Sequence, residues 1–188
     1  YAGLDDIVEF DYPGMDEGRV PEAVAFKGEQ AFSSAIQDIT QARSPVVYFL
    51  EGHGEHSVDD FDQRRGYSSL ARVMRRDNIT VKTVRFGEMH TLPEDTDALV
   101  IAGPVRRLSQ PEIDLLANHL AHNGRMILML DKDAETGLDP LLEEWGIRVG
   151  QDVVTDPSRT LSGDELFVTE YGLHPVTEHL AGITTIFY

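Results

Sequence analysis

Short apolar runs recur along the middle of the chain and predict the strands of a sheet. The runs "VVYFL" (46–50) and "ALVIA" (98–102) are continuously apolar, which is typical of strands buried on both faces. The stretches "ITVKTVRF" (79–86) and "RMILMLD" (125–131) predict two further strands. Because helical patterns separate these runs from residue 45 to about 150, the order predicts a mostly parallel sheet with helices on both faces.

The first of these helices is predicted over "GYSSLARVMRRDN" (66–78). Its apolar positions Leu70, Val73 and Met74 recur at helical spacing, so we expect them to face the core. Trp145, at the end of a short predicted helix in "DPLLEEWG", is expected to anchor the core through its large apolar ring.

The clearest helix boundaries lie in "LSQPEIDLLANHLAHNG" (108–124). Ser109 and Glu112 match the Ser-x-x-Glu capping box, and Pro111 suits the first turn of a helix. Asn-Gly at the end of the stretch is a typical helix terminator. In "DPLLEEWG", Asp139 is the predicted cap of the short helix.

The two ends of the chain follow other patterns. Residues 1–30 contain two short strand-like runs and predict a strand-rich N-terminal arm, whereas residues 31–188 are expected to form the α/β domain. A helix is predicted over 28–43, and residues 150–188 offer short runs expected to be edge strands. The chain starts at Tyr1 and stops just after an apolar run, which favours a domain excised from a longer protein.

Composition narrows the function classes. The net charge is −17, so binding to nucleic acid through a general electrostatic field is not expected. The chain has no cysteine, which excludes disulfides, thiolate metal sites and cysteine nucleophiles. The acidic surface, with few lysines, fits either a salty habitat or an ordinary acidic protein.

Two loops follow the predicted inner strands and carry the candidate site. Ligands of open α/β sheets bind beyond the carboxyl ends of the strands, and both loops should leave the sheet there. We expect the side chains of the first loop to point into a crevice, with arginines opposite that hold an anionic or hydroxyl-rich ligand or a partner. The candidate residues are His53, Gly54, Glu55, Gly103, Arg106 and Arg107.

The alternative for the same loops is a polar turn. Glycines after a strand commonly form only the turn, and His53 or Glu55 then satisfies neighbouring backbone amides. Catalysis by His53 and Glu55 as acid and base is a further alternative, as is a metal site that adds His56.

The sequence lacks the residues that a calcium loop, a nucleophile elbow or a Gly-rich phosphate loop requires. The acidic loop 131–142 has Thr136 and Leu142 where a calcium loop needs Gly and Glu. "IAGPVR" follows a strand as a nucleophile elbow does, yet it holds no Ser or Cys. No Gly-rich phosphate loop occurs. We therefore expect no cofactor, no metal and no catalytic residues.

Four stretches together resemble a known family. They are "VVYFLEGHGE", "DALVIAGPVRRLSQPEIDLLANHLAHNGRMILMLD", "LLEEWGIRVGQDVV" and "HPVTEHL". In this order, over roughly residues 20–188, they resemble the extracytoplasmic domain of the gliding-motility-type ABC-transporter auxiliary proteins. The resemblance implies a class I glutamine amidotransferase-like sandwich without its catalytic machinery. A flavodoxin-like sandwich is the alternative for the fold.

The resemblance also implies a function and a location. It implies a non-enzymatic binding or assembly module of a membrane-anchored protein, with the domain outside the cytoplasm. Its expected partners are the ABC transporter permease and ATPase subunits, and a homo-oligomer is possible. The alternatives are a hydrolase that uses Glu55 and His53, or an inert structural spacer.

Overall fold

The structure is a computed structural model. The chain forms two compact units, residues 1–148 and 149–188. The expected boundary near residue 30 stays a prediction, and the helix expected over 28–43 lies mostly outside the described residues. The described residues are 7–11, 22–26, 28, 29, 33, 36, 43–62, 65–87, 89–132, 134–150, 152, 154–160 and 165–187.

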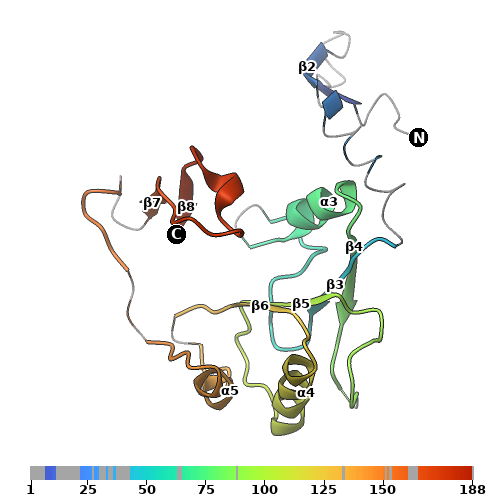
Figure 1. The fold of residues 1–188 in the computed structure, drawn as a ribbon, viewed down its shortest axis with the longest axis vertical. Coiled ribbons are helices and arrows are strands. Elements are labelled where there is room, and N and C mark those ends of the chain that lie inside the picture. Colours follow the sequence, from blue (N-terminus) through green and yellow to red (C-terminus); the bar gives the residue numbers. More distant parts are fainter. Residues whose placement is uncertain are drawn as a thin grey trace. The chain divides into compact units, whose positions relative to one another are not determined.

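A four-stranded parallel sheet forms the centre of the first unit (Figure 1). Its strands are β3 (Val46–Leu50), β4 (Thr80–Val84), β5 (Ala98–Ala102) and β6 (Met126–Met129), in the order β4-β3-β5-β6. Every neighbouring pair is parallel. The predicted α/β class is therefore confirmed, with the two continuously apolar runs as the inner strands. The narrower amidotransferase-like or flavodoxin-like assignment stays a prediction.

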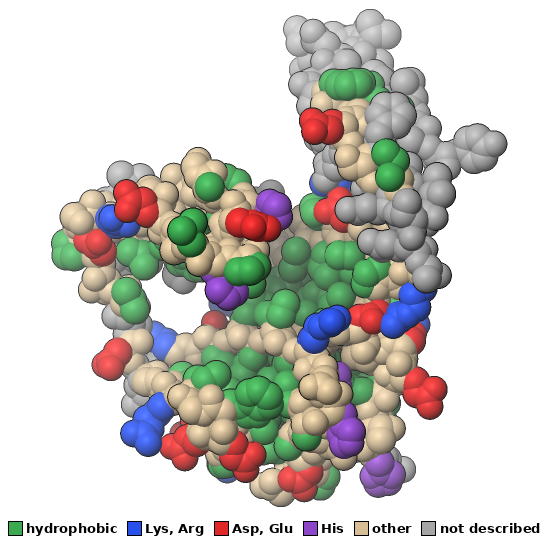
Figure 2. All heavy atoms as spheres, in the orientation of Figure 1, with side chains coloured by type: hydrophobic (Ala, Val, Ile, Leu, Met, Phe, Trp, Pro, Cys, Tyr) green, Lys and Arg blue, Asp and Glu red, His purple; other side chains and the backbone are tan. Residues whose placement is uncertain are grey.

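Helices cover both faces of this sheet because successive side chains of each strand point to opposite sides. Helices α4 (Gln110–Ala121) and α5 (Asp139–Glu144) pack on one face, and α3 (Ser68–Arg76) packs on the other (Figure 1). Hydrophobic side chains gather around the strands on the side of α3 and on the side of α4 and α5 (Figure 2). The face of α4 and α5 buries Tyr48, Leu50, Leu99 and Ile101, whereas the face of α3 buries Phe49, Val100 and Ala102.

The side-chain prediction for α3 is wrong in part, and the prediction that Trp145 anchors the core is wrong. In α3, Leu70 and Val73 are exposed, and the buried stripe consists of Ala71 with the half-buried Tyr67 and Met74. Ala71 is fully buried in the core cluster of this face, so the adjacent position 70 points away from the sheet. Trp145 is 58% exposed and anchors no core.

The short helix α5 begins one residue earlier than predicted. Leu138 occupies its N-cap position and is fully buried, while Asp139 lies in the first turn. The Leu138 amide donates a hydrogen bond to the hydroxyl of Thr136 at 3.3 Å. The acceptor at the start of this helix is therefore the side chain of Thr136 and not that of Asp139.

Two small antiparallel sheets complete the described strands. The predicted strand-rich N-terminal segment contains β1 (Val8–Asp11) and β2 (Glu22–Phe26), which pair with each other. In the second unit, β7 (Leu166–Val168) pairs with β8 (Thr185–Phe187), and a 3₁₀ turn spans Glu178–Leu180. These last strands form their own sheet and do not extend the parallel one. Among the helices of the described residues, none has the length and apolar character needed to span a bilayer.

Asp97 joins the starts of two strands. Its carboxylate accepts a bidentate pair of bonds from Arg43, both at 2.6 Å, and a third bond from the Val46 amide at 2.7 Å. The Asp97 amide in turn donates to the Val46 carbonyl at 2.9 Å. The bonds from Arg43 and Val46 hold the pKa of the Asp97 carboxyl below its ordinary value. Asp97 therefore sets where β3 enters the sheet beside β5.

We expect Asp97→Ala to lower the free energy of unfolding by about 1–3 kcal/mol, because the Val46 amide loses its charged acceptor. Urea denaturation followed by circular dichroism measures this loss. Asp59→Ala is the matched control, since the exposed Asp59 carboxylate makes no hydrogen bond to another described residue. Equal stability of the two variants would contradict the assignment.

Candidate functional site

The two loops beyond β3 and β5 meet at the carboxyl edge of the sheet, as predicted. The carbonyl oxygen of His53 accepts hydrogen bonds from the amides of Val105 and Arg106, both at 2.9 Å. The amide of His56 donates to the carbonyl of Ala102 at 2.8 Å. Backbone bonds therefore tie loop 51–56 to loop 103–107 through His53 and to the end of β5 through His56.

Two glycines permit this close approach. Gly54 has φ +86°, and a Cβ there would collide with a methyl group of Val105. Gly103 has φ +62°, and its Cβ would lie 2.8 Å from the ring of His56. In both positions the left-handed backbone and the lack of space require glycine.

Glu55 turns inward and supports the loop. Its carboxylate accepts a hydrogen bond from the His53 amide at 2.7 Å and lies 3.3 Å from His53 Nδ1. The Glu55 side chain is only 1% exposed, so the expectation that it points into an open crevice is wrong. The positive φ of Gly52 and Gly54 folds the loop back on itself, which brings the carboxylate under the His53 amide.

His53 extends this support to helix α4. Its Nε2 lies 3.2 Å from the carboxylate of Glu112, which also accepts bonds from the amide and hydroxyl of Ser109, each at 2.7 Å. Ser109 and Glu112 form the predicted capping box, with a Pro in the first turn. Since neutral imidazole has one donor nitrogen, only a doubly protonated ring donates to both carboxylates.

The environment of Glu112 favours its ionised form. Burial raises the pKa of this carboxyl, but the hydrogen bonds from Ser109 and the nearby His53 outweigh burial. The pKa of Glu112 consequently lies below its ordinary value of 4.5. The negative charge also lies in the first turn of α4, where the helix dipole stabilises it.

Three exposed residues, Val105, Arg106 and Arg107, form what we call the 105–107 rim. Val105 is 62% exposed above Gly54. The guanidinium of Arg106 donates to the carbonyl of Gly52, so this arginine contacts the first loop's backbone and not Glu55. Arg107 lies along Gly137, with 3.0 Å between its Nε and a Cβ placed on that glycine.

Sequence reasoning did not find a second group beside the loops. The ring of His56 stacks on Tyr67 with 5.3 Å between ring centroids, and an oxygen of the Asp131 carboxylate would lie 3.3 Å from a Cβ placed on Gly103. Burial, and then the charge of Asp131, raise the pKa of the Tyr67 hydroxyl. The three residues of this group come from segments far apart in the sequence that meet only in the folded chain, so no local sequence pattern indicates the group.

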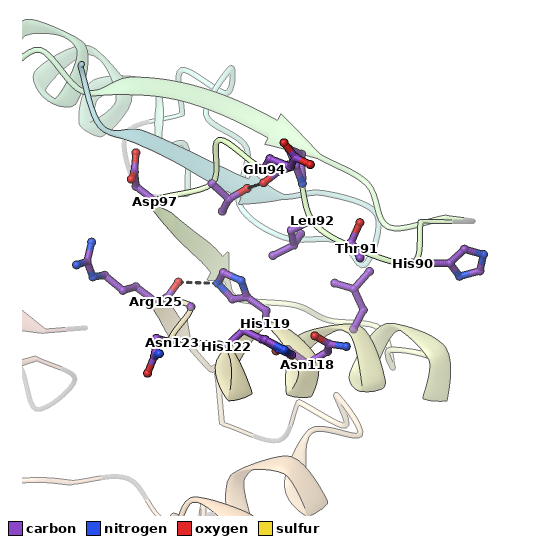
Figure 3. A pocket seen from close by; sticks show the side chains of 14 residues that line it. His90, Thr91, Leu92, Glu94, Asp97, Asn118, His119, His122, Asn123 and Arg125 are labelled. Atoms are coloured by element: carbon purple, nitrogen blue, oxygen red, sulfur yellow. Dashed lines mark hydrogen bonds between the residues drawn. The ribbon is translucent and has the colours of Figure 1, made fainter. Parts of the chain in front are cut away.

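The structure also contains a pocket of about 400 Å³ at the opposite, amino-terminal edge of the sheet (Figure 3). The connection 90–97 forms one wall, and the last turns of α4 with the following turn form the other. Two of its histidines bind backbone: His119 Nε2 lies 3.2 Å from the Arg125 carbonyl, and His122 Nδ1 lies 2.9 Å from that of Asn118. These histidines therefore help to end α4.

The metal alternative finds no arranged ligands among the described residues. No group of three His, Asp or Glu side chains in that part of the chain is placed to hold a metal ion. His53 lies between two carboxylates, whereas the neighbouring His56 stacks on a tyrosine ring, so the two rings serve different partners.

We expect the free energy of unfolding to depend on pH through Glu112. A carboxyl whose folded pKa is depressed adds stability above its unfolded pKa, and this stability is lost as the pH falls through the folded pKa. Glu112→Gln should therefore be less stable than wild type by about 1 kcal/mol at pH 7. The difference should narrow as the pH falls below 4.5.

Urea denaturation at a series of pH values measures this difference. The exposed Glu144→Gln on α5 is the matched control and should follow the wild-type curve. A difference between Glu112→Gln and wild type that stays constant from neutral to acid pH would contradict the role of the Glu112 charge.

Comparisons with known proteins agree with the fold and assign a family. The structure is similar to the mmIFT52 N-terminal domain, with a TM-score of 0.58 and 21% identity over 76% of this chain. The chain spans 64% of that structure's length, and this likeness concerns the fold alone. No curated protein matches the chain.

The family model matches residues 44–181, which include the parallel sheet and both loops of the candidate site. A match over this part of the chain supports an auxiliary role in ABC-type transport. The chain belongs to the family described as "ABC-type uncharacterized transport system".

Proposed function

We propose that this chain is a non-enzymatic assembly module of an ABC transporter and that the 105–107 rim contacts the permease. The observation that carries the proposal is a difference between the two loops: side chains of the first are hydrogen-bonded within the structure, and side chains of the second are exposed. The polar groups of His53 and Glu55 contact each other and Glu112 of α4, whereas Val105 and the adjacent arginines are exposed. A rigid support beneath an exposed apolar and basic rim suits recognition of a protein, because little order is lost on binding.

The geometry of Gly103 also favours a role without catalysis. This residue lies just after an inner strand with φ +62°, where a nucleophile elbow would carry its reactive side chain. Any Cβ there would lie 2.8 Å from the His56 ring. Glu55, the acid or base of the hydrolase alternative, is 1% exposed and so poorly placed to meet a substrate.

The remaining parts of the proposal rest on the family resemblance. We place the domain on the extracytoplasmic side, in a membrane-anchored, gliding-motility-type auxiliary protein that works with permease and ATPase subunits. The family match to an ABC-type transport system supports an association of this kind. An inert spacer would need no exposed rim at a fixed position, and the loop bonds favour the binding role over it.

Capture of the cognate permease by the immobilised chain tests the proposal. Val105→Asp and Arg107→Glu change only exposed rim side chains, so each should reduce capture at least about tenfold, as expected for a central contact. Melting temperatures of both variants should stay close to that of wild type.

The matched control is Arg72→Glu, which reverses an exposed arginine on α3. It should capture the permease as well as wild type does. Equal capture by the control and by both rim variants would overturn the assignment of the rim.

A further inference from the structure

Strand β6 ends the parallel sheet, and its four residues carry none of the charges, prolines or bulges that protect many edge strands. The strand reads Met-Ile-Leu-Met. The opposite edge strand, β4, carries Lys82 at its centre, paired with Asp95 at 2.6 Å. Edge lysines commonly block pairing with another chain. The β4 edge carries such a lysine, whereas β6 has no charged residue.

The backbone bonds show which groups of β6 face outward. The carbonyl of Arg125 accepts a bond from the amide of Leu99 in β5 at 3.0 Å, and the carbonyl of Met129 accepts one from the amide of Gly103, just after β5, at 2.9 Å. The backbone polar groups of successive residues in a strand point to opposite edges. The amides and carbonyls of residues 125, 127 and 129 therefore face β5. The amides and carbonyls of Met126, Leu128 and Leu130 therefore point outward, and no described strand pairs with them.

The stretch from Arg125 to Asp131 is complementary to itself in the antiparallel direction. In a register centred on Leu128, this residue lies opposite Leu128 of the second copy. The two form a hydrogen-bonded pair, because the backbone amide and carbonyl of Leu128 face outward. Ile127, which is 56% exposed, then lies opposite Met129 on the face that holds α3. Arg125 lies opposite Asp131, an opposite-charge pair that occurs twice by symmetry.

We propose that β6 pairs antiparallel with β6 of a second copy, so that two parallel sheets join in a two-fold dimer. Neither Arg125 nor Asp131 forms a salt bridge within the described residues. Asp131 leans toward Gly103 in the single chain and turns outward on pairing. This dimer is independent of the permease contact, because β6 and the 105–107 rim are different surfaces.

Sedimentation equilibrium of the 188-residue chain tests the dimer at protein concentrations up to about 500 µM, since small interfaces of this kind are weak. Repulsion between two chains of charge −17 opposes association, so the first measurement uses about 0.5 M NaCl, where the Debye length is about 4 Å. Wild type should dimerise. Ile127→Lys should weaken the dimer at least about tenfold by placing an edge lysine at the pairing surface.

Ile147→Lys is the matched control, because Ile147 is 52% exposed on the same unit but lies outside β6. It should dimerise like wild type. A charge exchange gives a second test at about 0.15 M NaCl, where charges are screened less. Arg125→Asp should raise the Kd about five- to tenfold, and the double variant with Asp131→Arg should restore it.

Three results would overturn the proposal. They are a monomeric wild type at every concentration and salt level, equal weakening by the two lysine variants, and no recovery in the charge-exchanged double variant. Circular dichroism melting of each variant separates a lost dimer from a lost fold.

Discussion

The carbonyl oxygen of His53 is the point on which the carboxyl edge of this sheet depends. By accepting the amides of Val105 and Arg106, it joins two loops that are about fifty residues apart in the chain. The bond requires the loop to turn through Gly52 and Gly54 and the second loop to begin at a left-handed Gly103. Glu55 stabilises that turn from below through the His53 amide.

These constraints explain why an acid- and histidine-rich motif serves structure here. A buried carboxylate is costly unless hydrogen bonds satisfy it, and the His53 amide and ring do so for Glu55. The same ring reaches Glu112, so the loop pair and the start of α4 form one connected polar network. The exposed residues next to this network are those of the 105–107 rim, the surface that we propose for recognition.

Much of the fold could be predicted because its signals are local. Continuous apolar runs identified β3 and β5 as inner strands, and Ser109 with Glu112 marked the start of α4. The meeting of the two loops also followed from sequence, since parallel strands share a carboxyl edge. These inferences need only periodicity, capping chemistry and topology.

Side-chain direction could not be predicted in the same way. In α3, a stripe through Leu70 and Val73 and one through Ala71 have the same helical spacing, and only tertiary packing selects the smaller residue. Glu55 reads as an exposed acid until the backbone path through two glycines is known. The stack of His56 on Tyr67 depends on segments that the sequence does not show to be neighbours.

Amide hydrogen exchange at Val105 and Arg106 tests the central claim most directly, because both amides report on the His53 carbonyl. In wild type, both should exchange nearly as slowly as the β5 amides. Glu55→Leu, which removes the acceptor of the His53 amide, should speed their exchange at least about tenfold and leave the β5 amides slow. Fast exchange at Val105 and Arg106 in wild type, or unchanged exchange in the variant, would contradict a loop pair held by the Glu55-supported carbonyl.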